Sequence, residues 1–73
     1  MNETQTIIVA HSQYQYDMCQ SYLKGEVRLG VMYPLMITYY NEIMKLYNGH
    51  SINHVSDEDV AIKFCEHVKP PKT

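Results

Sequence analysis

The sequence predicts a small α+β domain with one or two short strands and three helices. Three observations lead to this fold class: a β-branched apolar run at residues 5–10, capping residues before two amphipathic segments, and an uninterrupted segment with helical apolar spacing at residues 34–47. A mostly helical bundle, with residues 5–10 as an extended N-terminal arm, is the alternative. The length of 73 residues permits one domain, residues 1–73, and we expect flexible ends at about 1–4 and 68–73.

The N-terminal third of the chain predicts a strand followed by a helix. Residues 5–10 (QTIIVA) are short and almost continuously apolar, which suits a buried strand. Ser12 and Gln15 have the spacing of a capping box, in which each side chain satisfies a free backbone N–H. We therefore expect a helix from about residue 12 to residue 24. Gly25 follows at the position where a glycine with left-handed backbone angles commonly ends a helix.

The middle of the chain predicts a second strand and a long helix. Residues 27–33 (VRLGVMY) alternate in polarity, which is typical of a strand that could pair in parallel with the first. Pro34 suits the first turn of a helix, and apolar residues then recur at three- and four-residue spacing through Tyr47. These residues form an apolar band along one side of the helix, and the band is widened by Leu35, Ile37 and Leu46. The helix is therefore either central in the core or offers a second face to a partner.

A third helix is predicted at residues 57–67. Ser56 supplies an N-cap hydroxyl, and the acidic residues Asp57, Glu58 and Asp59 complement the positive end of the helix dipole. The spacing of apolar residues along this segment predicts a buried side. That side consists of Val60, Ala61, Phe64, Cys65 and Val68.

The charge and hydropathy of the chain argue against two classes of partner. The formal net charge is −2, the isoelectric point is near 6.0, and the six Lys and Arg residues are spread along the sequence, so no direct DNA binding is expected. No apolar run approaches the roughly 18 residues that span a bilayer, and the N-terminus lacks the basic and apolar regions of a signal peptide. We expect a cytoplasmic protein without membrane contact.

Candidate catalytic and metal-binding residues do not form a recognisable motif. His50, His54, Cys65 and His67 could be assembled into a zinc site, but the two cysteines are far apart in the sequence and the spacing fits no zinc module. Cys19 and Cys65 are expected to be two buried thiols. No oxyanion-hole signature or glycine-rich phosphate loop is present. We therefore expect no catalytic residues, no metal and no cofactor, and a protein that is not an enzyme.

Tyrosine is the main functional clue in the composition. Seven of the eight aromatic residues are Tyr, and five Met accompany them; both residue types are enriched where proteins bind proteins. Tyr14 and Tyr16 are two apart on the first helix and cannot both face the core, so we expect Tyr14 to be exposed. The acidic spot at residues 57–59 could also meet a basic partner. The predicted protein-binding residues are Ile7, Tyr14, Glu26, Asp57 and Glu58.

The opening TIIVAHSQYQYDMCQSYL leads from a strand into a capped helix, in a short chain that lacks an enzymatic or metal motif. In these respects the chain resembles the small accessory proteins with which bacteriophages control host enzymes, among them regulators of host RNA polymerase. The resemblance implies a monomer in the host bacterial cytoplasm that binds the N-terminal region of the polymerase β′ subunit. Such a protein hinders σ-dependent initiation and promotes terminator read-through. The alternatives are a phage inhibitor of another host enzyme, such as a CRISPR effector or nuclease, and a small metal- or nucleic-acid-binding module.

Overall fold

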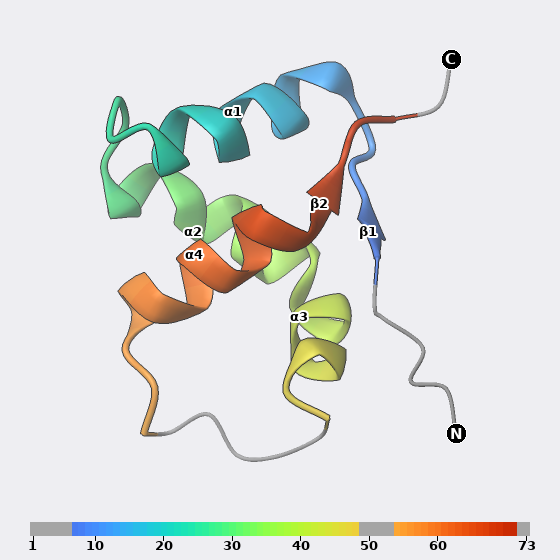
Figure 1. The fold of residues 1–73 in the computed structure, drawn as a ribbon, viewed down its shortest axis with the longest axis vertical. Helices are drawn as coiled ribbons and strands as arrows, with labels where there is room; N and C mark the ends of the chain where they lie inside the picture. The colour runs from blue at the N-terminus through green and yellow to red at the C-terminus, as the bar shows by residue number, and fades with distance from the viewer. Residues whose placement is uncertain (1–6, 49–53, 72–73) are drawn as a thin grey trace.

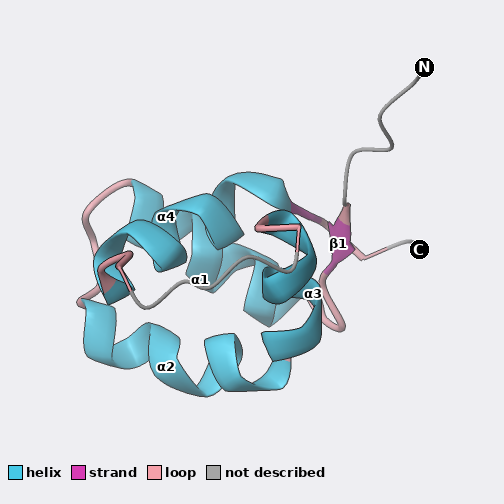
Figure 2. Cartoon of the chain, turned by 90° about the horizontal axis from the view of Figure 1, so that it is seen from below, coloured by secondary structure: helices cyan, strands magenta, loops and turns pink. Residues whose placement is uncertain are grey.

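A computed structural model describes residues 7–48 and 54–71 and shows four helices with a two-stranded parallel sheet in these segments (Figure 1). The fold class is confirmed as a small domain, mostly helical, with short strands. In chain order the elements are β1 (Ile8–Val9), α1 (Gln13–Leu23), α2 (Leu29–Thr38), α3 (Tyr40–Leu46), α4 (Asp57–His67) and β2 (Val68–Lys69). The sheet lies at one end of the helices, and α1 and α4 lie on one side of the domain, with α2 on the other (Figure 2).

The sheet pairs the two ends of the described chain. Ile8 is opposite Val68 and Val9 is opposite Lys69 in parallel register, and the Ala10 amide donates to the Lys69 carbonyl at 3.0 Å. The predicted parallel partner at residues 27–33 is therefore wrong. Val68 and Lys69, which we expected in a loose end, form β2 instead. The expected loose residues 1–4, and residues 5 and 6 of the expected first strand, lie outside the described residues.

The segment predicted as a second strand is the beginning of α2. Arg28 is the N-cap residue, with extended backbone angles, and the helix starts at Leu29. Leu29 and Met32 are three apart, so the same residues that alternate in polarity also satisfy helical spacing. Met32 and Leu35 are buried against the rest of the domain. Tertiary packing selects the helix because it buries this side of the segment.

The long helix predicted at residues 34–47 is two helices. The backbone of Tyr39 has φ −103° and ψ 23°, and it separates α2 from α3. Just before this residue, the Thr38 hydroxyl donates to the Pro34 carbonyl at 2.9 Å. A side chain that bonds back to the preceding turn competes with the backbone ladder and bends the helix. Pro34 lies inside α2 and not in the first turn of a helix as expected, and its missing N–H affects the preceding turn of α2, away from this junction.

The predicted ends of the first helix are confirmed. The Ser12 side chain accepts from the Gln15 amide at 3.3 Å, while the Gln15 side chain accepts from the His11 amide at 3.2 Å, so half of the expected capping box forms. At the other end, Gly25 has φ +82°, the left-handed conformation expected there. The amides of Gly25 and Glu26 donate to Tyr22 and Ser21 in the paired pattern that closes many helices.

Helix α4 spans the predicted residues and buries the predicted side. Ser56 has extended backbone angles, and its hydroxyl accepts from the Asp59 amide at 3.1 Å. Four positions of the helix are buried, and Val68 immediately after it is also buried. The buried helix residues are Val60, Ala61, Phe64 and Cys65.

Removal of the Ser56 hydroxyl is expected to destabilise the domain. The Ser56→Ala variant leaves the Asp59 amide without its side-chain acceptor, so the free energy of unfolding should fall by about 1 kcal/mol. Urea unfolding followed by circular dichroism measures this loss. The Ser56→Asp variant keeps an acceptor at the cap and should recover most of the stability. An unchanged unfolding midpoint in Ser56→Ala would show that the cap contributes nothing.

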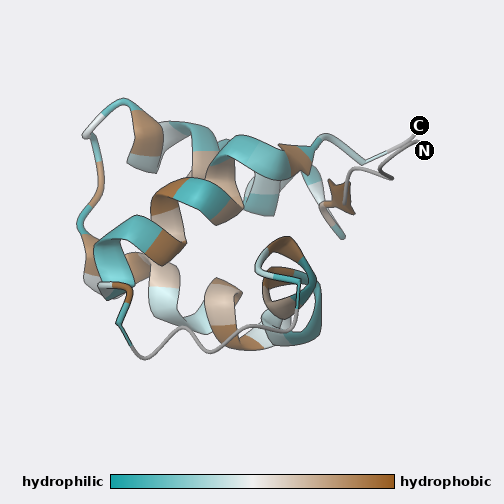
Figure 3. Ribbon diagram, turned by 60° about the horizontal axis from the view of Figure 1, so that its bottom comes forward, coloured by the Kyte–Doolittle hydropathy of each residue, from teal (hydrophilic) through white to brown (hydrophobic). Residues whose placement is uncertain are grey.

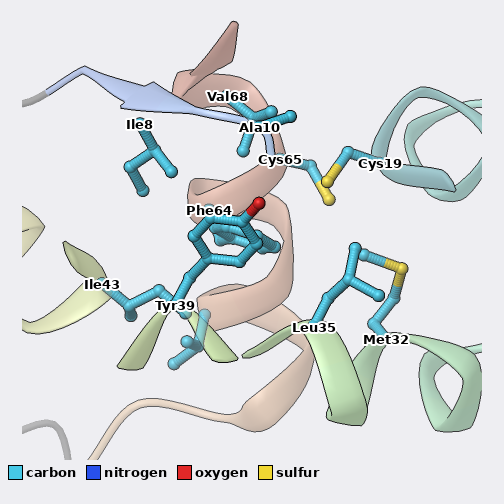
Figure 4. Packing of buried hydrophobic residues seen from close by; sticks show 11 residues of the cluster. Ile8, Ala10, Cys19, Met32, Leu35, Tyr39, Ile43, Phe64, Cys65 and Val68 are labelled. Carbon is cyan, nitrogen blue, oxygen red and sulfur yellow. The ribbon is translucent and has the colours of Figure 1, made fainter. Parts of the chain in front are cut away.

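The core lies between the helices and the inner side of the sheet (Figure 4). Along the helix ribbons, bands of hydrophobic residues alternate with hydrophilic ones, as expected for amphipathic elements (Figure 3). Phe64 is fully buried, and its ring centroid lies 5.4 Å from that of Tyr39. The full buried cluster consists of Ile8, Ala10, Cys19, Met32, Leu35, Tyr39, Ile43, Val60, Phe64, Cys65 and Val68.

Tyr39 connects the junction of α2 and α3 to the start of α1. Its hydroxyl accepts from the His11 amide at 2.8 Å and donates to the Gln15 side-chain oxygen. The His11 and Tyr39 ring centroids are 4.8 Å apart. Burial raises the pKa of Tyr39 above the ordinary tyrosine value. The folded structure therefore favours the neutral form of the Tyr39 side chain over the ionised form.

This raised pKa predicts a loss of stability at alkaline pH. Tyr39 binds its proton more tightly in the folded state, so its contribution is complete below the unfolded pKa of about 10 and is lost as pH rises through the folded pKa. Urea midpoints should therefore fall as pH rises above about 10. A Tyr39→Phe variant should start less stable and show a shallower decline. If the urea midpoint of Tyr39→Phe fell as steeply with pH as that of the unmodified chain, groups other than Tyr39 would cause the loss of stability.

Candidate protein-binding surface

An apolar groove lies between α2, α3 and the start of α4. Its cavity volume is about 190 Å³, which is below the roughly 300 Å³ from which small-molecule sites usually begin. The groove is therefore the size of an inserted side chain or two. We call it the α2 groove; its lining residues are Tyr33, Met36, Ile37, Tyr40, Ile43, Asp57 and Val60.

Three large apolar side chains along one side of the groove are open to solvent. Ile37 is 74% exposed, Tyr40 is 57% exposed and Tyr33 is 40% exposed. Their spacing of four and three residues places them on one face across the junction of α2 and α3. Met32 and Leu35 take the opposite, buried side of α2. Helix α2 is thus apolar on both sides, and only one of them is covered within the described chain.

Tyr33 joins this face to the acidic start of α4. Its hydroxyl donates to the Asp57 carboxylate at 2.8 Å. This hydrogen bond, followed by partial desolvation, raises the pKa of Tyr33. Asp57 is exposed and lines the groove, and none of the lining residues carries a positive charge. The groove therefore combines an apolar floor with an uncompensated negative edge.

A second, wider hollow lies on the other side of the first turn of α4. Its volume is about 570 Å³, and it lies between the end of α1, the α1–α2 loop and α4. Glu58 lines this hollow while its neighbour Asp57 lines the α2 groove, so the first turn of α4 borders both. Glu26 is exposed in the loop that contributes Gly25 and Val27 to the hollow. The full lining is Tyr22, Leu23, Gly25, Val27, Arg28, Leu29, Glu58, Ile62 and Glu66.

The structure brings together only part of the predicted binding site. Glu26, Asp57 and Glu58 are exposed around the first turn of α4 and the adjoining loop. Ile7, 59% exposed, precedes β1, and Tyr14, 67% exposed, is in the first turn of α1. The exposure expected for Tyr14 is confirmed. Ile7, Tyr14 and Glu26 line neither the groove nor the hollow, and the binding role of all five predicted residues stays a prediction.

Apart from Asp57, the residues that line the groove are not among the binding residues predicted from the sequence. The sequence pattern places Tyr33 in a strand, and it leaves Tyr40 equally compatible with the margin of the core and with contact to a partner. The signal that could have found them is the extra width of the apolar band at Ile37, which already indicated a second face on this helix. The groove itself depends on where α4 packs, and the sequence pattern does not contain that information.

The two cysteines are buried, and the ring of His67 lies against a backbone carbonyl. Cys19 and Cys65 are each 1% exposed, and both are free thiols, as expected. The His67 ring nitrogen Nδ1 lies 2.8 Å from the Lys63 carbonyl. Within residues 7–48 and 54–71, no three His, Cys, Asp or Glu side chains gather into a metal-binding arrangement. His50 of the considered zinc set lies outside the described residues.

Comparison with protein-family models, curated proteins and solved structures finds no significant match to this chain. Among the helices of the described segments, none combines the length and apolarity that crossing a bilayer requires. The surface of the molecule itself is therefore what bears on its function.

Proposed function

We propose that this chain is a regulatory protein that acts without catalysis, by attaching through the α2 groove to a larger protein. The observation that carries the proposal is the exposed row Tyr33, Ile37 and Tyr40 beside a groove of side-chain size. Aromatic and large aliphatic side chains that insert into pockets supply most of the energy of protein interfaces. A standard interface hides about 800 Å² per partner, which one face of a domain this small can provide.

The acidic first turn of α4, from which Asp57 reaches the groove, indicates the chemistry of the partner. Asp57, Glu58 and Asp59 are all exposed in the first turn of α4. A partner segment that places an apolar side chain in the groove and a Lys or Arg beside it would satisfy both features. Charge complementarity of this kind directs association and selects the partner. The occupant we propose is accordingly a basic, partly apolar segment of a larger protein.

We propose host bacterial RNA polymerase as that partner, bound through the N-terminal region of its β′ subunit. The target comes from the resemblance to phage regulators; the groove supplies a means of attachment compatible with it. By covering this region, a monomer in the bacterial cytoplasm would hinder σ-dependent initiation and favour terminator read-through. Its effect is limited by the difference between its affinities for the two states of the polymerase.

Affinity capture from a bacterial lysate tests the target. The tagged chain should retain the β and β′ subunits, and the Ile37→Ser variant should lose them. Recovery of a different host enzyme would replace polymerase with that enzyme as the target. Retention on heparin or DNA at moderate salt would instead favour a nucleic-acid-binding module.

A titration of purified polymerase tests the absence of catalysis. If the chain acts by occupying a surface, inhibition of σ-dependent transcription should rise in proportion to added protein and level off near one equivalent. Complete inhibition at a small fraction of an equivalent would indicate turnover and would contradict a binding mechanism.

Charge reversal in the first turn of α4, beside the groove, should slow association. Glu58→Lys removes one acidic group from the α4 turn and adds a basic one, so we expect a lower association rate and a weaker salt dependence. Glu66→Lys is the matched control because it makes the same change in net charge near the other end of α4. Stopped-flow association at several salt concentrations separates the two. Equal effects of both variants would indicate net charge alone.

A further inference from the structure

The cysteines that are 46 positions apart in the sequence meet in the core. Cys19 extends from α1 and Cys65 from α4, and their sulfur atoms point toward each other (Figure 4). Hydrogen bonding between the two thiols shifts their pKa values in opposite directions. Both are 1% exposed, and both belong to the main hydrophobic cluster. No other pair of cysteines exists in the chain.

We infer that Cys19 and Cys65 form a dithiol that low-molecular-weight disulfides such as oxidised glutathione convert reversibly into an intramolecular disulfide. This reaction is independent of the proposed polymerase binding. It would join α1 to α4 covalently across the core.

The steps balance as two consecutive thiol–disulfide exchanges. The Cys19 thiolate attacks one sulfur of oxidised glutathione, which forms a Cys19–glutathione disulfide and releases one glutathione thiolate. Cys65 then loses its proton and attacks the Cys19 sulfur, which forms the Cys19–Cys65 bond and releases the second glutathione thiolate. Each thiolate released takes up a proton. The protein loses two hydrogens, and one oxidised glutathione becomes two reduced molecules.

The environment of the pair determines the order of attack. The hydrogen bond from Cys65 lowers the pKa of Cys19, whereas the same hydrogen bond, with burial, raises the pKa of Cys65. The thiolate is the attacking form, so Cys19 reacts first. A glutathione group on Cys19 does not fit the closed core at a position that is 1% exposed, so it keeps α1 and α4 apart until the neighbouring Cys65 displaces it.

Burial sets the rate of the reaction. Oxidised glutathione reaches Cys19 only when α1 separates from α4, so the folded chain should react more slowly than the unfolded chain. Urea well below the unfolding midpoint should accelerate the reaction. Once formed, the disulfide should shift the thermal unfolding midpoint upward, since it restricts the unfolded chain.

Intact-mass spectrometry of the folded chain treated with oxidised glutathione tests the inference. We expect a monomer lighter by two hydrogen atoms, with no retained glutathione, and full reversal by dithiothreitol. In Cys65→Ser, the glutathione adduct should accumulate on Cys19. The urea-unfolded chain is the control for reagent activity. A folded chain that stays reduced while the control oxidises, that retains two glutathione groups, or that forms disulfide-linked dimers would overturn the inference.

Discussion

Replacement of Ile37 by Ser is expected to weaken binding of the partner by about thirtyfold or more, while the fold stays intact. Ile37 is the most exposed of the large apolar side chains in the described segments, and it lines the α2 groove. A central anchor of an interface contributes about 2 kcal/mol or more, which corresponds to this loss in affinity. Because the side chain lies outside the core, the unfolding midpoint should change little.

Ile7→Ser is the matched control for this substitution. It makes the same chemical change at another exposed isoleucine, 59% open to solvent, that lies before β1 and away from the groove. Isothermal titration calorimetry with the captured partner compares the two variants. Loss of affinity in Ile37→Ser alone supports the α2 groove. Loss in Ile7→Ser alone would move the interface to the site that the sequence predicted around Ile7 and Tyr14.

Replacement of Phe64 by Ala is expected to unfold much of the population. Phe64 is fully buried and packs against Tyr39, with 5.4 Å between ring centroids. Truncation of a core phenylalanine costs about 3 to 5 kcal/mol, which approaches the whole stability that a domain of this size usually has. The circular dichroism signal of the helices, measured at 25 °C, should therefore be much weaker in Phe64→Ala than in the unmodified chain.

The control for Phe64→Ala lies on the same helix. Ile62→Ala removes a large side chain at a position that is 37% exposed, so it should destabilise the domain much less. Urea titration of both variants gives the comparison. A similar loss in the two variants would mean that burial in the core does not determine the effect.

Local sequence signals predicted the elements whose ends are set by neighbouring residues. Ser12 and Gly25 mark the ends of α1, and Ser56 marks the start of α4, because caps act on backbone groups a few residues away. Apolar spacing also identified the buried side of α4 through Val60 and Phe64. These features do not depend on the rest of the fold.

Features that depend on distant contacts were not predicted. The apolar residues of the 27–33 segment satisfy both strand and helix spacing, and packing of Met32 in the core decides for the helix. The pairing of Ile8 with Val68 joins opposite ends of the chain, which no local pattern indicates. The same limit applies to the groove, since Tyr33 meets Asp57 only after α2 and α4 pack together.

Hydroxyl-radical footprinting of the complex tests the central claim, that the α2 groove is the binding surface, most directly. Side-chain oxidation is compared in the free chain and in the chain bound to its captured partner. We predict strong protection of Tyr33, Ile37 and Tyr40, with Tyr14 oxidised equally in both states. Protection confined to Tyr14, with Ile37 and Tyr40 as reactive as in the free chain, would contradict the claim.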